Sequence, residues 1–401
     1  FSEVAKKSYG FTAPKKIIEC VQAACELTVV DGIAFEQQVF MQLISGPSSA
    51  SLRYVFFQEQ LLKHVAFVDK KQTVKPIESV GIVGGGLMGS GIAIAVAKRG
   101  NTVIMVEVDA SRQEATNAAV YNYFNKQYKQ KKIDKQEMQA CIARISVSTI
   151  MADLSNVDLV IEAVFEDMQV KKDVFKQLGE IAKPEAVLAS NTSGLDINEL
   201  AVASGRPQQV VGMHFFSPAP VMKLVEVVCA DKSAADVMQQ TIDFTKHIKK
   251  LPVVVNVCPG FVGNRMVIRY LKQVEYLLLR GVQPEQIDKA LMDFGFAMGP
   301  CAMADMSGLE IAMHMIPGDS LAAALVKSGR LGQKNHAGFY DYKIDFMTAS
   351  PSAEAKDVIE EYANSLGIDK AIFSDADIVQ RCVLALVDEA VAIMAEGVVS
   401  R

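Results

Sequence analysis

The stretch Ser79-Val80-Gly81-Ile82-Val83-Gly84-Gly85-Gly86-Leu87-Met88-Gly89 decides how this chain folds. Residues 79–84 form a short apolar run with the length of a buried strand, and the glycines after it favour a tight turn. Apolar residues then continue from Leu87 to Arg99, and Gly100 ends the segment, which predicts a helix. A strand, a glycine turn and a helix in succession are typical of the first unit of a parallel α/β sheet.

The same region has one competing interpretation, a membrane span. Ser79–Ala97 is 19 residues long and carries no charge, which approaches the length of a lipid-spanning helix. It contains six glycines, however, and three of them stand in a row. This clustering favours strand, turn and helix, so we expect no membrane span.

Strand-like and helix-like segments alternate from Thr102 to Val255. The apolar runs that predict strands cover residues 102–107, 158–164, 186–190, 210–215, 224–228 and 253–255. Helical patterns lie between them, and the longest covers about 111–145. This order predicts a Rossmann-type, doubly wound and mostly parallel sheet with helices on both faces.

Both flanks of this region have helical patterns. Before it, amphipathic segments begin at Ala13, break at Asp31-Gly32 and restart at Pro47, and a polar linker, Asp69–Pro76, follows. After Pro259-Gly260 only helical patterns remain, interrupted by a glycine-rich loop at 329–342. We therefore expect an N-terminal helical linker (1–75), the α/β domain (76–258), an all-α C-terminal domain (259–350) and the start of a further helical unit (351–401).

The composition excludes several classes of protein. The chain has 401 residues, 50% of them hydrophobic, and a net charge of −5, which argues against a disordered chain and against a nucleic-acid binder. Seven cysteines without a CxxC pair indicate free thiols, and five histidines without ligand spacing indicate no metal site. Because the chain starts at Phe1 and stops inside an expected helix, we expect a piece of a longer protein.

The glycine turn matches GxGxxG, which is specific only in the right context. Here it follows a strand, opens a helix, and is followed by Glu107 at the end of the next strand. Gly84 permits the turn, Gly86 lets the backbone approach a pyrophosphate, and Gly89 allows close packing. The helix that begins at Leu87-Met88 then directs free N–H groups at the phosphates. A carboxylate at Glu107 accepts from ribose hydroxyls and repels a 2′-phosphate, which favours NAD over NADP; the alternative is a packing turn without a ligand.

His214 and Glu226 are the candidate acid–base pair. His214 ends one strand, and Glu226 lies among apolar residues in the next, where a carboxylate must be paired or protonated. Such a carboxylate can hold one ring N–H and leave the other nitrogen as a base. The alternative is a histidine that caps a strand and a glutamate on an exposed edge.

Three further polar features stand near strand ends or helix starts. Ser193 belongs to a polar turn after the strand at 186–190, where open α/β sheets bind ligands, and Asn264 begins an apolar helix. Either side chain could equally be a simple capping group. A basic belt, Lys126, Lys129, Lys131, Lys132 and Lys135, is either a solvated helix face or a contact for the phosphates of a bulky anionic substrate.

Taken together, these motifs resemble the L-3-hydroxyacyl-CoA dehydrogenase family over about residues 76–345. The matching pieces are GGGLMG at 84–89, EAVFEDMQVKKDVF at 162–175, SNTSGL at 190–195, HFFSPAPVMKLVEVV at 214–228 and PGFVGNR at 259–265. The flanking segments resemble the helical linker after the hydratase region, and the helical repeats, of fused multifunctional β-oxidation enzymes of the peroxisomal bifunctional type.

The resemblance implies NAD-dependent oxidation of (3S)-3-hydroxyacyl-CoA to 3-ketoacyl-CoA. It places the catalytic base on His214 and its orienting acid on Glu226, with Ser193 and Asn264 as substrate contacts. It places cofactor contacts on the glycine turn (Gly84, Gly86, Leu87, Met88 and Gly89) and on Glu107, Glu166, Lys171 and Ser193. Many relatives carry Asp at the position of Glu107, which keeps the carboxylate with a shorter reach.

The resemblance also implies partners and a location. An acyl-CoA substrate, a hydratase domain that packs on the helical linker, and a peroxisomal or bacterial cytoplasmic location are expected. Two other functions stay open: a related β-hydroxyacid dehydrogenase that acts on a free acid with a lysine base, and an idle scaffold that binds NAD or acyl-CoA.

Overall fold

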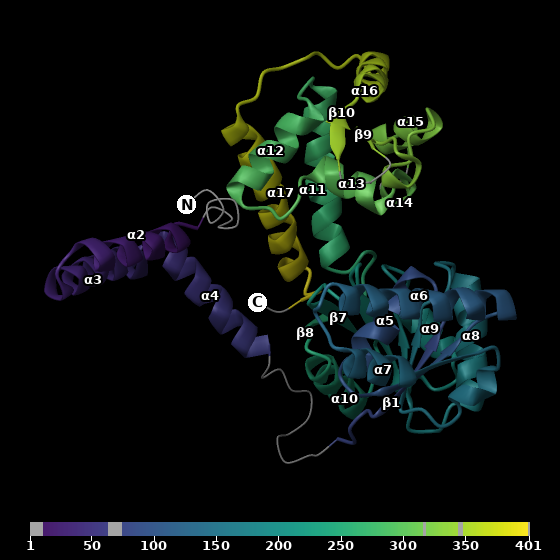
Figure 1. Ribbon diagram of the computed structural model, residues 1–401. Coiled ribbons are helices and arrows are strands. Elements are labelled where there is room, and N and C mark those ends of the chain that lie inside the picture. Colours follow the sequence, from purple (N-terminus) through teal and green to yellow (C-terminus); the bar gives the residue numbers. More distant parts are fainter. Residues whose placement is uncertain (1–10, 63–73, 316–317, 344–347, 400–401) are drawn as a thin grey trace. The chain divides into compact units, whose positions relative to one another are not determined.

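The computed structural model describes residues 11–62, 74–315, 318–343 and 348–399, so Asp69–Thr73 of the expected linker lie outside the described residues. The chain divides into two compact units (Figure 1). The sheet unit comprises Phe56–Asn264 and Ile393–Arg401, and the helical unit comprises Phe1–Val55 and Arg265–Ala392. All seven cysteines are free thiols. None of the described helices is long and apolar enough to span a membrane.

The sheet unit contains an eight-stranded sheet in the order β3-β2-β1-β4-β5-β6-β7-β8. Every neighbouring pair is parallel except β6 and β7, which are antiparallel. The strand order turns back between β1 and β4, the place where doubly wound sheets bind their ligands. The strands are β1 (Ser79–Val83), β2 (Thr102–Val106), β3 (Ile145–Ser148), β4 (Leu159–Glu162), β5 (Val187–Ser190), β6 (Val210–Phe215), β7 (Leu224–Cys229) and β8 (Leu251–Asn256).

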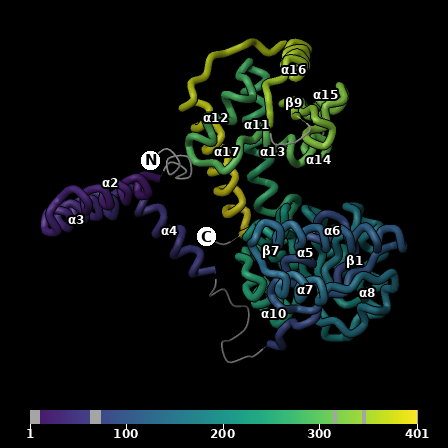
Figure 2. The backbone as a smooth tube through the Cα atoms, viewed as in Figure 1, coloured from purple at the N-terminus to yellow at the C-terminus, as the bar shows by residue number. Residues whose placement is uncertain are grey.

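Helices cover both faces of this sheet, as the alternating pattern predicts (Figure 2). α5 (Leu87–Ala97) and α10 (Ala235–His247) pack on one face, and α8 (Met168–Ile181) and α9 (Ile197–Ala203) pack on the other. Nine residues of α5 are buried, which explains why its sequence is apolar all round. The expected Rossmann-type fold class is therefore confirmed.

Two sequence-based expectations were wrong in detail. The long helix expected at about 111–145 is two helices, α6 (Ala110–Lys129) and α7 (Lys135–Ala143), followed by the unexpected strand β3. The Asp134 side chain caps α7, so a polar break separates the two helices. The N-terminal break falls at Leu27-Thr28 and not at Asp31-Gly32, because Thr28 caps α3 and leaves Asp31 in its first turn.

The part of the helical unit between Tyr270 and Cys382 packs around one apolar core. Arg265 and Arg269 on α11 both donate to the carboxylate of Glu389 on α17, each at 2.8 Å. The N-terminal helices are α2 (Ala13–Glu26), α3 (Val29–Ser45) and α4 (Pro47–Leu62). The others are α11 (Gly263–Leu279), α12 (Pro284–Phe294), α13 (Pro300–Ser307), α14 (Leu309–Met315), α15 (Leu321–Lys327), α16 (Ala353–Ser365) and α17 (Asp375–Ala395), with a small hairpin of β9 (Tyr340–Tyr342) and β10 (Ala349–Pro351).

The glycine-rich loop of the helical unit is held by a buried carboxylate. Asp305 is 1% exposed and accepts the N–H groups of Phe339 and Tyr340 at 2.8 and 3.0 Å, together with the hydroxyl of Tyr342 at 2.9 Å. A Cβ at Gly338 would lie 2.0 Å from the same carboxylate. Only glycine therefore allows this close approach.

Asp158 ties the amino ends of β1 and β4 together. Its carboxylate accepts the N–H groups of Glu78 and Ser79, each at 3.0 Å, and the Lys183 ammonium at 2.6 Å. Burial alone would raise the pKa of Asp158, but Lys183 and the donors of Ser79 and Glu78 outweigh it, so the pKa is lowered.

We predict that Asp158→Asn lowers the free energy of unfolding by about 1.5–3 kcal/mol at pH 7, since hydrogen bonds to a charged group are lost. Because the folded-state pKa is depressed, the carboxylate stabilises the fold above its unfolded pKa of about 3.9, and this contribution disappears as the pH falls. Urea unfolding should show a constant deficit from pH 7 to pH 5 that narrows below about pH 4. A deficit independent of pH would contradict the electrostatic explanation.

Candidate active site

The glycine turn leaves room for a ligand at one position and is tightly packed at the others. Gly84 has φ +94°, and a Cβ there would lie 2.7 Å from the carbonyl oxygen of Ala163. A Cβ at Gly89 would lie 1.9 Å from the oxygen of Gly84. Gly86 caps α5, has no side chain to bond its first turn, and a Cβ there would meet nothing within 4 Å. The Gly84 and Gly85 N–H groups donate to the Val106 carbonyl and to Glu107, so it is the first turn of α5, after Gly86, that offers N–H groups to an anion.

Glu107 holds the glycine turn as well as standing at the end of β2. It is 9% exposed, and its Oε1 accepts the Gly85 N–H at 2.8 Å and the Thr116 hydroxyl at 3.1 Å. A Cβ at Gly85 would lie 2.6 Å from the same oxygen. Among the described residues, the only hydrogen bond that Oε2 accepts is a long one, from the Val108 N–H at 3.3 Å. This oxygen can therefore still accept a ribose hydroxyl.

Three exposed apolar side chains follow β1, β2 and β4, one at the first position of α5 and two in loops, and sequence reasoning singled out only the first of them. Leu87, Val108 and Phe165 are 79%, 84% and 81% exposed. Met88, by contrast, is partly buried and packs against the apolar core that α5 and α10 form with the sheet. Exposed apolar groups beside open N–H groups suit a ligand with flat rings and phosphates, so this edge fits a dinucleotide.

Lys171 lies between two carboxylates at the carboxyl ends of β4 and β5. It is 1% exposed, and its Nζ lies 2.7 Å from Glu162 Oε1 and 3.1 Å from Glu166 Oε2. Burial would raise the pKa of Glu166, but the charge of Lys171 and hydrogen bonds from Thr192 and Ser193 outweigh it and lower the pKa. Glu162 was not singled out from the sequence, although the run Glu162-Ala163 at the end of an apolar strand could have marked it as a buried acid.

Ser193 and Asn264 meet at the polar turn after β5. The Ser193 N–H and hydroxyl donate to Glu166 Oε1 at 2.7 and 3.0 Å, and the Asn264 amide donates to the Ser193 carbonyl at 3.1 Å. Asn191, which the sequence did not single out, accepts the Phe215 N–H at 2.9 Å. The turn is thereby attached to β6 directly after its histidine.

His214 and Glu226 are cross-strand partners in the antiparallel β6–β7 pair. The imidazole Nδ1 lies 2.7 Å from Glu226 Oε2, and the two residues are 6% and 1% exposed. With Nδ1–H donating to the carboxylate, Nε2 of the neutral ring carries the free lone pair. Glu226 is therefore buried and paired, and the alternative of a glutamate on an exposed edge is wrong.

The other oxygen of Glu226 holds the start of α11. Oε1 accepts the N–H groups of Val262 and Gly263 at 3.0 and 2.8 Å. The rings of Phe216 and Phe261 pack beside the imidazole, with centroids 4.5 and 5.9 Å away. The carboxylate thus accepts three hydrogen bonds in an apolar surrounding, and this arrangement fixes the orientation of the imidazole ring.

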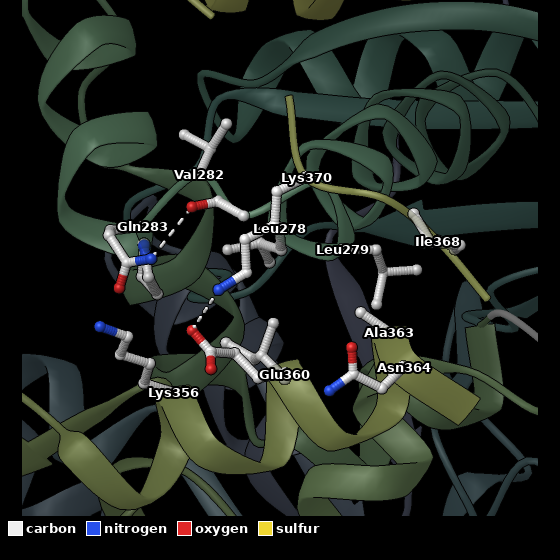
Figure 3. A pocket seen from close by; sticks show the side chains of 13 residues that line it. Leu278, Leu279, Val282, Gln283, Lys356, Glu360, Ala363, Asn364, Ile368 and Lys370 are labelled. Atoms are coloured by element: carbon white, nitrogen blue, oxygen red, sulfur yellow. Dashed lines mark hydrogen bonds and ion pairs between the residues drawn. The ribbon is translucent and has the colours of Figure 1, made fainter. Parts of the chain in front are cut away.

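A hollow in the helical unit is separate from these residues (Figure 3). It lies between the α11–α12 turn and α16, with Leu278 and Ile359 in its wall and the Lys370–Glu360 ion pair at 2.9 Å across it. None of the predicted site residues lines it. The basic belt on α6 and α7 is exposed throughout, as a solvated face or an anion contact requires.

The fold and these contacts define a class, an α/β dinucleotide-binding domain with a buried histidine–carboxylate pair. The sequence patterns described as "3-hydroxyacyl-CoA dehydrogenase, NAD binding domain" and "3-hydroxyacyl-CoA dehydrogenase, C-terminal domain" match residues 79–258 and 260–342. The chain belongs to the 3-hydroxyacyl-CoA dehydrogenase family.

The chain is similar in sequence to a longer peroxisomal enzyme and in structure to two dehydrogenases. The peroxisomal bifunctional enzyme of Cavia porcellus is 37% identical over 97% of the chain, which spans only 57% of that relative's length. The structure of (S)-3-hydroxybutyryl-CoA dehydrogenase from Ralstonia eutropha is 33% identical, with a TM-score of 0.61 over 67% of this chain and 99% of that one. The dehydrogenase part of multifunctional enzyme 1 from C. elegans is 28% identical, with a TM-score of 0.64 over 86% and 83%.

We predict that Glu107→Ala weakens NAD binding by about tenfold to a hundredfold and relaxes discrimination against NADP, because a charged acceptor of the glycine turn and of the ribose is lost. Titration with both nucleotides measures the effect. Asp109→Asn, which removes a charge two residues away at the exposed cap of α6, is the matched control. Unchanged affinity in the Glu107 variant would rule out the ribose role.

Proposed function

We propose that this chain oxidises (3S)-3-hydroxyacyl-CoA to 3-ketoacyl-CoA with NAD⁺ in fatty acid β-oxidation. The observation that carries the proposal is the 2.7 Å contact between His214 Nδ1 and Glu226 in an NAD-binding domain of the dehydrogenase family. This pair provides an oriented base at the carboxyl edge of the sheet.

His214 and Glu226 perform the proton transfer. His214 Nε2 takes the proton of the 3-hydroxyl group, and the O–H electrons form the C=O bond. NAD⁺, when bound, accepts the hydride that leaves C3. Glu226 keeps the ring in one tautomer and stabilises the imidazolium that forms, since its carboxylate lies next to Nδ1.

Ser193 and Asn264 orient the substrate in this proposal. Ser193 is exposed, Asn264 is half-buried, and the two are joined through the Ser193 carbonyl, so one can contact the reacting oxygen and the other the thioester. On the cofactor side, the glycine turn receives the pyrophosphate, Glu107 the ribose, and Glu166 and Lys171 the nicotinamide half.

The basic belt would meet the phosphates of CoA. Its five lysines are exposed around the α6–α7 turn, and the ion pairs of the described residues include none of them. The adenosine 3′-phosphate and the pyrophosphate of CoA carry charge of the opposite sign. This supports acyl-CoA over a free hydroxy acid as the substrate.

The exposed apolar residues of the N-terminal helices support a hydratase domain that packs on this linker. Phe40, Phe56 and Phe57 are 58%, 55% and 59% exposed on α3 and α4, and apolar surface of this kind marks an interaction site. The organisation proposed for the chain is a linker (1–75), an NAD-binding domain (76–258), a helical domain (259–350) and the start of a second repeat (351–401). A peroxisomal location is proposed, with the bacterial cytoplasm as the alternative, because the peroxisomal enzyme of Cavia porcellus and the bacterial enzyme of Ralstonia eutropha are both similar to this chain.

We predict that His214→Gln lowers kcat by about 10²–10⁴-fold while the NAD dissociation constant stays nearly unchanged, because a general base is removed and the glycine turn is not. NADH oxidation with acetoacetyl-CoA measures turnover, and the same assay with free keto acids tests the alternative substrate class. His247→Gln is the control, since His247 ends α10 and bonds Asn101 and neither member of the pair. Full turnover in the His214 variant would contradict the assignment of His214 as the general base.

We predict that replacing Lys126, Lys129 and Lys132 by alanine raises KM for acetoacetyl-CoA about tenfold or more, and more strongly at low salt, because charges that attract the nucleotide are lost. The matched control is acetoacetyl-pantetheine, which lacks the nucleotide and should keep its KM. An equal change for both substrates would show that the belt does not contact the phosphates.

A further inference from the structure

Glu162 is a buried carboxylate that the proposed reaction does not use. It ends β4 and is 0% exposed, and its Oε1 accepts the Val164 N–H at 2.8 Å. The Lys171 ammonium lies 2.7 Å from the same oxygen, and the Ser190 hydroxyl donates to Oε2 at 2.6 Å. Burying a carboxylate is costly unless it is paired, and here both oxygens of Glu162 have hydrogen-bond donors.

The pairing leaves a surplus of negative charge. Glu162, Lys171 and Glu166, here called the lysine–carboxylate trio, contain two carboxylates around one ammonium, which gives a formal charge of −1. The other groups that bond the trio are neutral hydroxyl and backbone donors from Ser190, Thr192, Ser193 and Val164. The charge is therefore stabilised by dipoles and not cancelled.

The trio lies at the point where the strand order turns back. Glu162 pairs with Val83 at the end of β1, and the backbone of Gly84 packs on Ala163, where a Cβ would come within 2.7 Å of the oxygen. The net negative charge is thus next to the glycine turn and under the crevice in which a doubly wound sheet holds its dinucleotide.

We propose that Glu162, through Lys171 and Glu166, biases this site toward NAD⁺ over NADH. The inference rests on the proposed binding of the nicotinamide half at this edge. Both forms carry the same pyrophosphate, and they differ by one positive charge on the ring. A partly buried charge of −1 attracts the oxidised ring more than the neutral reduced one, so the protein holds its oxidant and releases the reduced product. Glu162 is a positioning and charge-setting residue and does not touch the ligand.

The test compares dissociation constants for NAD⁺ and NADH in wild-type protein and in Glu162→Gln. The amide can keep the bonds to Val164, Lys171 and Ser190, while the trio becomes neutral. NADH binding is followed by its fluorescence, and NAD⁺ binding by calorimetry. We expect the affinity ratio of NAD⁺ to NADH to fall on the order of tenfold, as one unit charge in a partly buried site predicts.

Three further variants make the result decisive. Glu162→Asp keeps the charge and should keep the ratio near the wild-type value. Asp158→Asn removes a carboxylate from the opposite end of the same strand, and should leave the ratio unchanged although it destabilises the fold. Glu166→Gln, at a side chain 42% exposed, replaces the first variant if that one does not fold, and should shift the ratio in the same direction.

If Glu162→Gln weakens the binding of both nucleotides equally, the role of Glu162 is purely structural and the proposal is overturned. An unchanged affinity ratio in folded Glu162→Gln overturns it as well. If Glu162→Gln does not fold, an unchanged ratio in Glu166→Gln has the same consequence. Failure of the wild-type protein to bind either nucleotide would instead overturn the proposed function itself. Nucleotide binding by the wild-type protein thus tests the proposed function, and the affinity ratio in the variants tests the role of Glu162.

Discussion

The buried carboxylate of Glu226 is the interaction on which the rest of the site depends. One oxygen holds the imidazole of His214 at 2.7 Å, and the other accepts two N–H groups at the start of α11. Because the β6–β7 pair is antiparallel, a single register places the acid opposite the base. A shift of one residue would turn every side chain of β7 to the other face and separate the pair.

Buried carboxylates also hold backbone N–H groups at two other strand ends. Glu107 after β2 accepts the N–H of Gly85, and Glu162 at the end of β4 accepts the N–H of Val164. Each carboxylate satisfies a backbone donor that a tight loop would otherwise leave without a partner. The carboxyl edge of the sheet is consequently held by buried carboxylates, which suits the proposed site, where a cationic ring would bind and His214 would take a proton.

Local sequence patterns predicted much of the fold, and most of the wrong predictions concerned where helices and strands begin and end. The strand at Ile145–Ser148 is short and only half-buried, so its residues looked like the end of a helix. Helix capping by Thr28 and Asp134 depends on a single side chain and competes with stronger apolar periodicity nearby. In the site, Asn191, Thr116 and Glu162 went unnoticed because most of their partners lie 9 to 31 residues away in the sequence.

The sequence by itself determined the glycine turn and the alternation of strands and helices, and it marked His214 and Glu226 as a candidate pair with a capping histidine and an exposed glutamate as the alternative. These are local consequences of glycine sterics, of apolar periodicity and of the cost of placing a charge among aliphatic residues. Only the tertiary structure decided that Glu226 also holds α11, that Glu107 also holds the glycine turn, and that Lys171 lies between two acids. Hydrogen-bond partners are chosen by the packing of distant segments, and no local pattern encodes that choice.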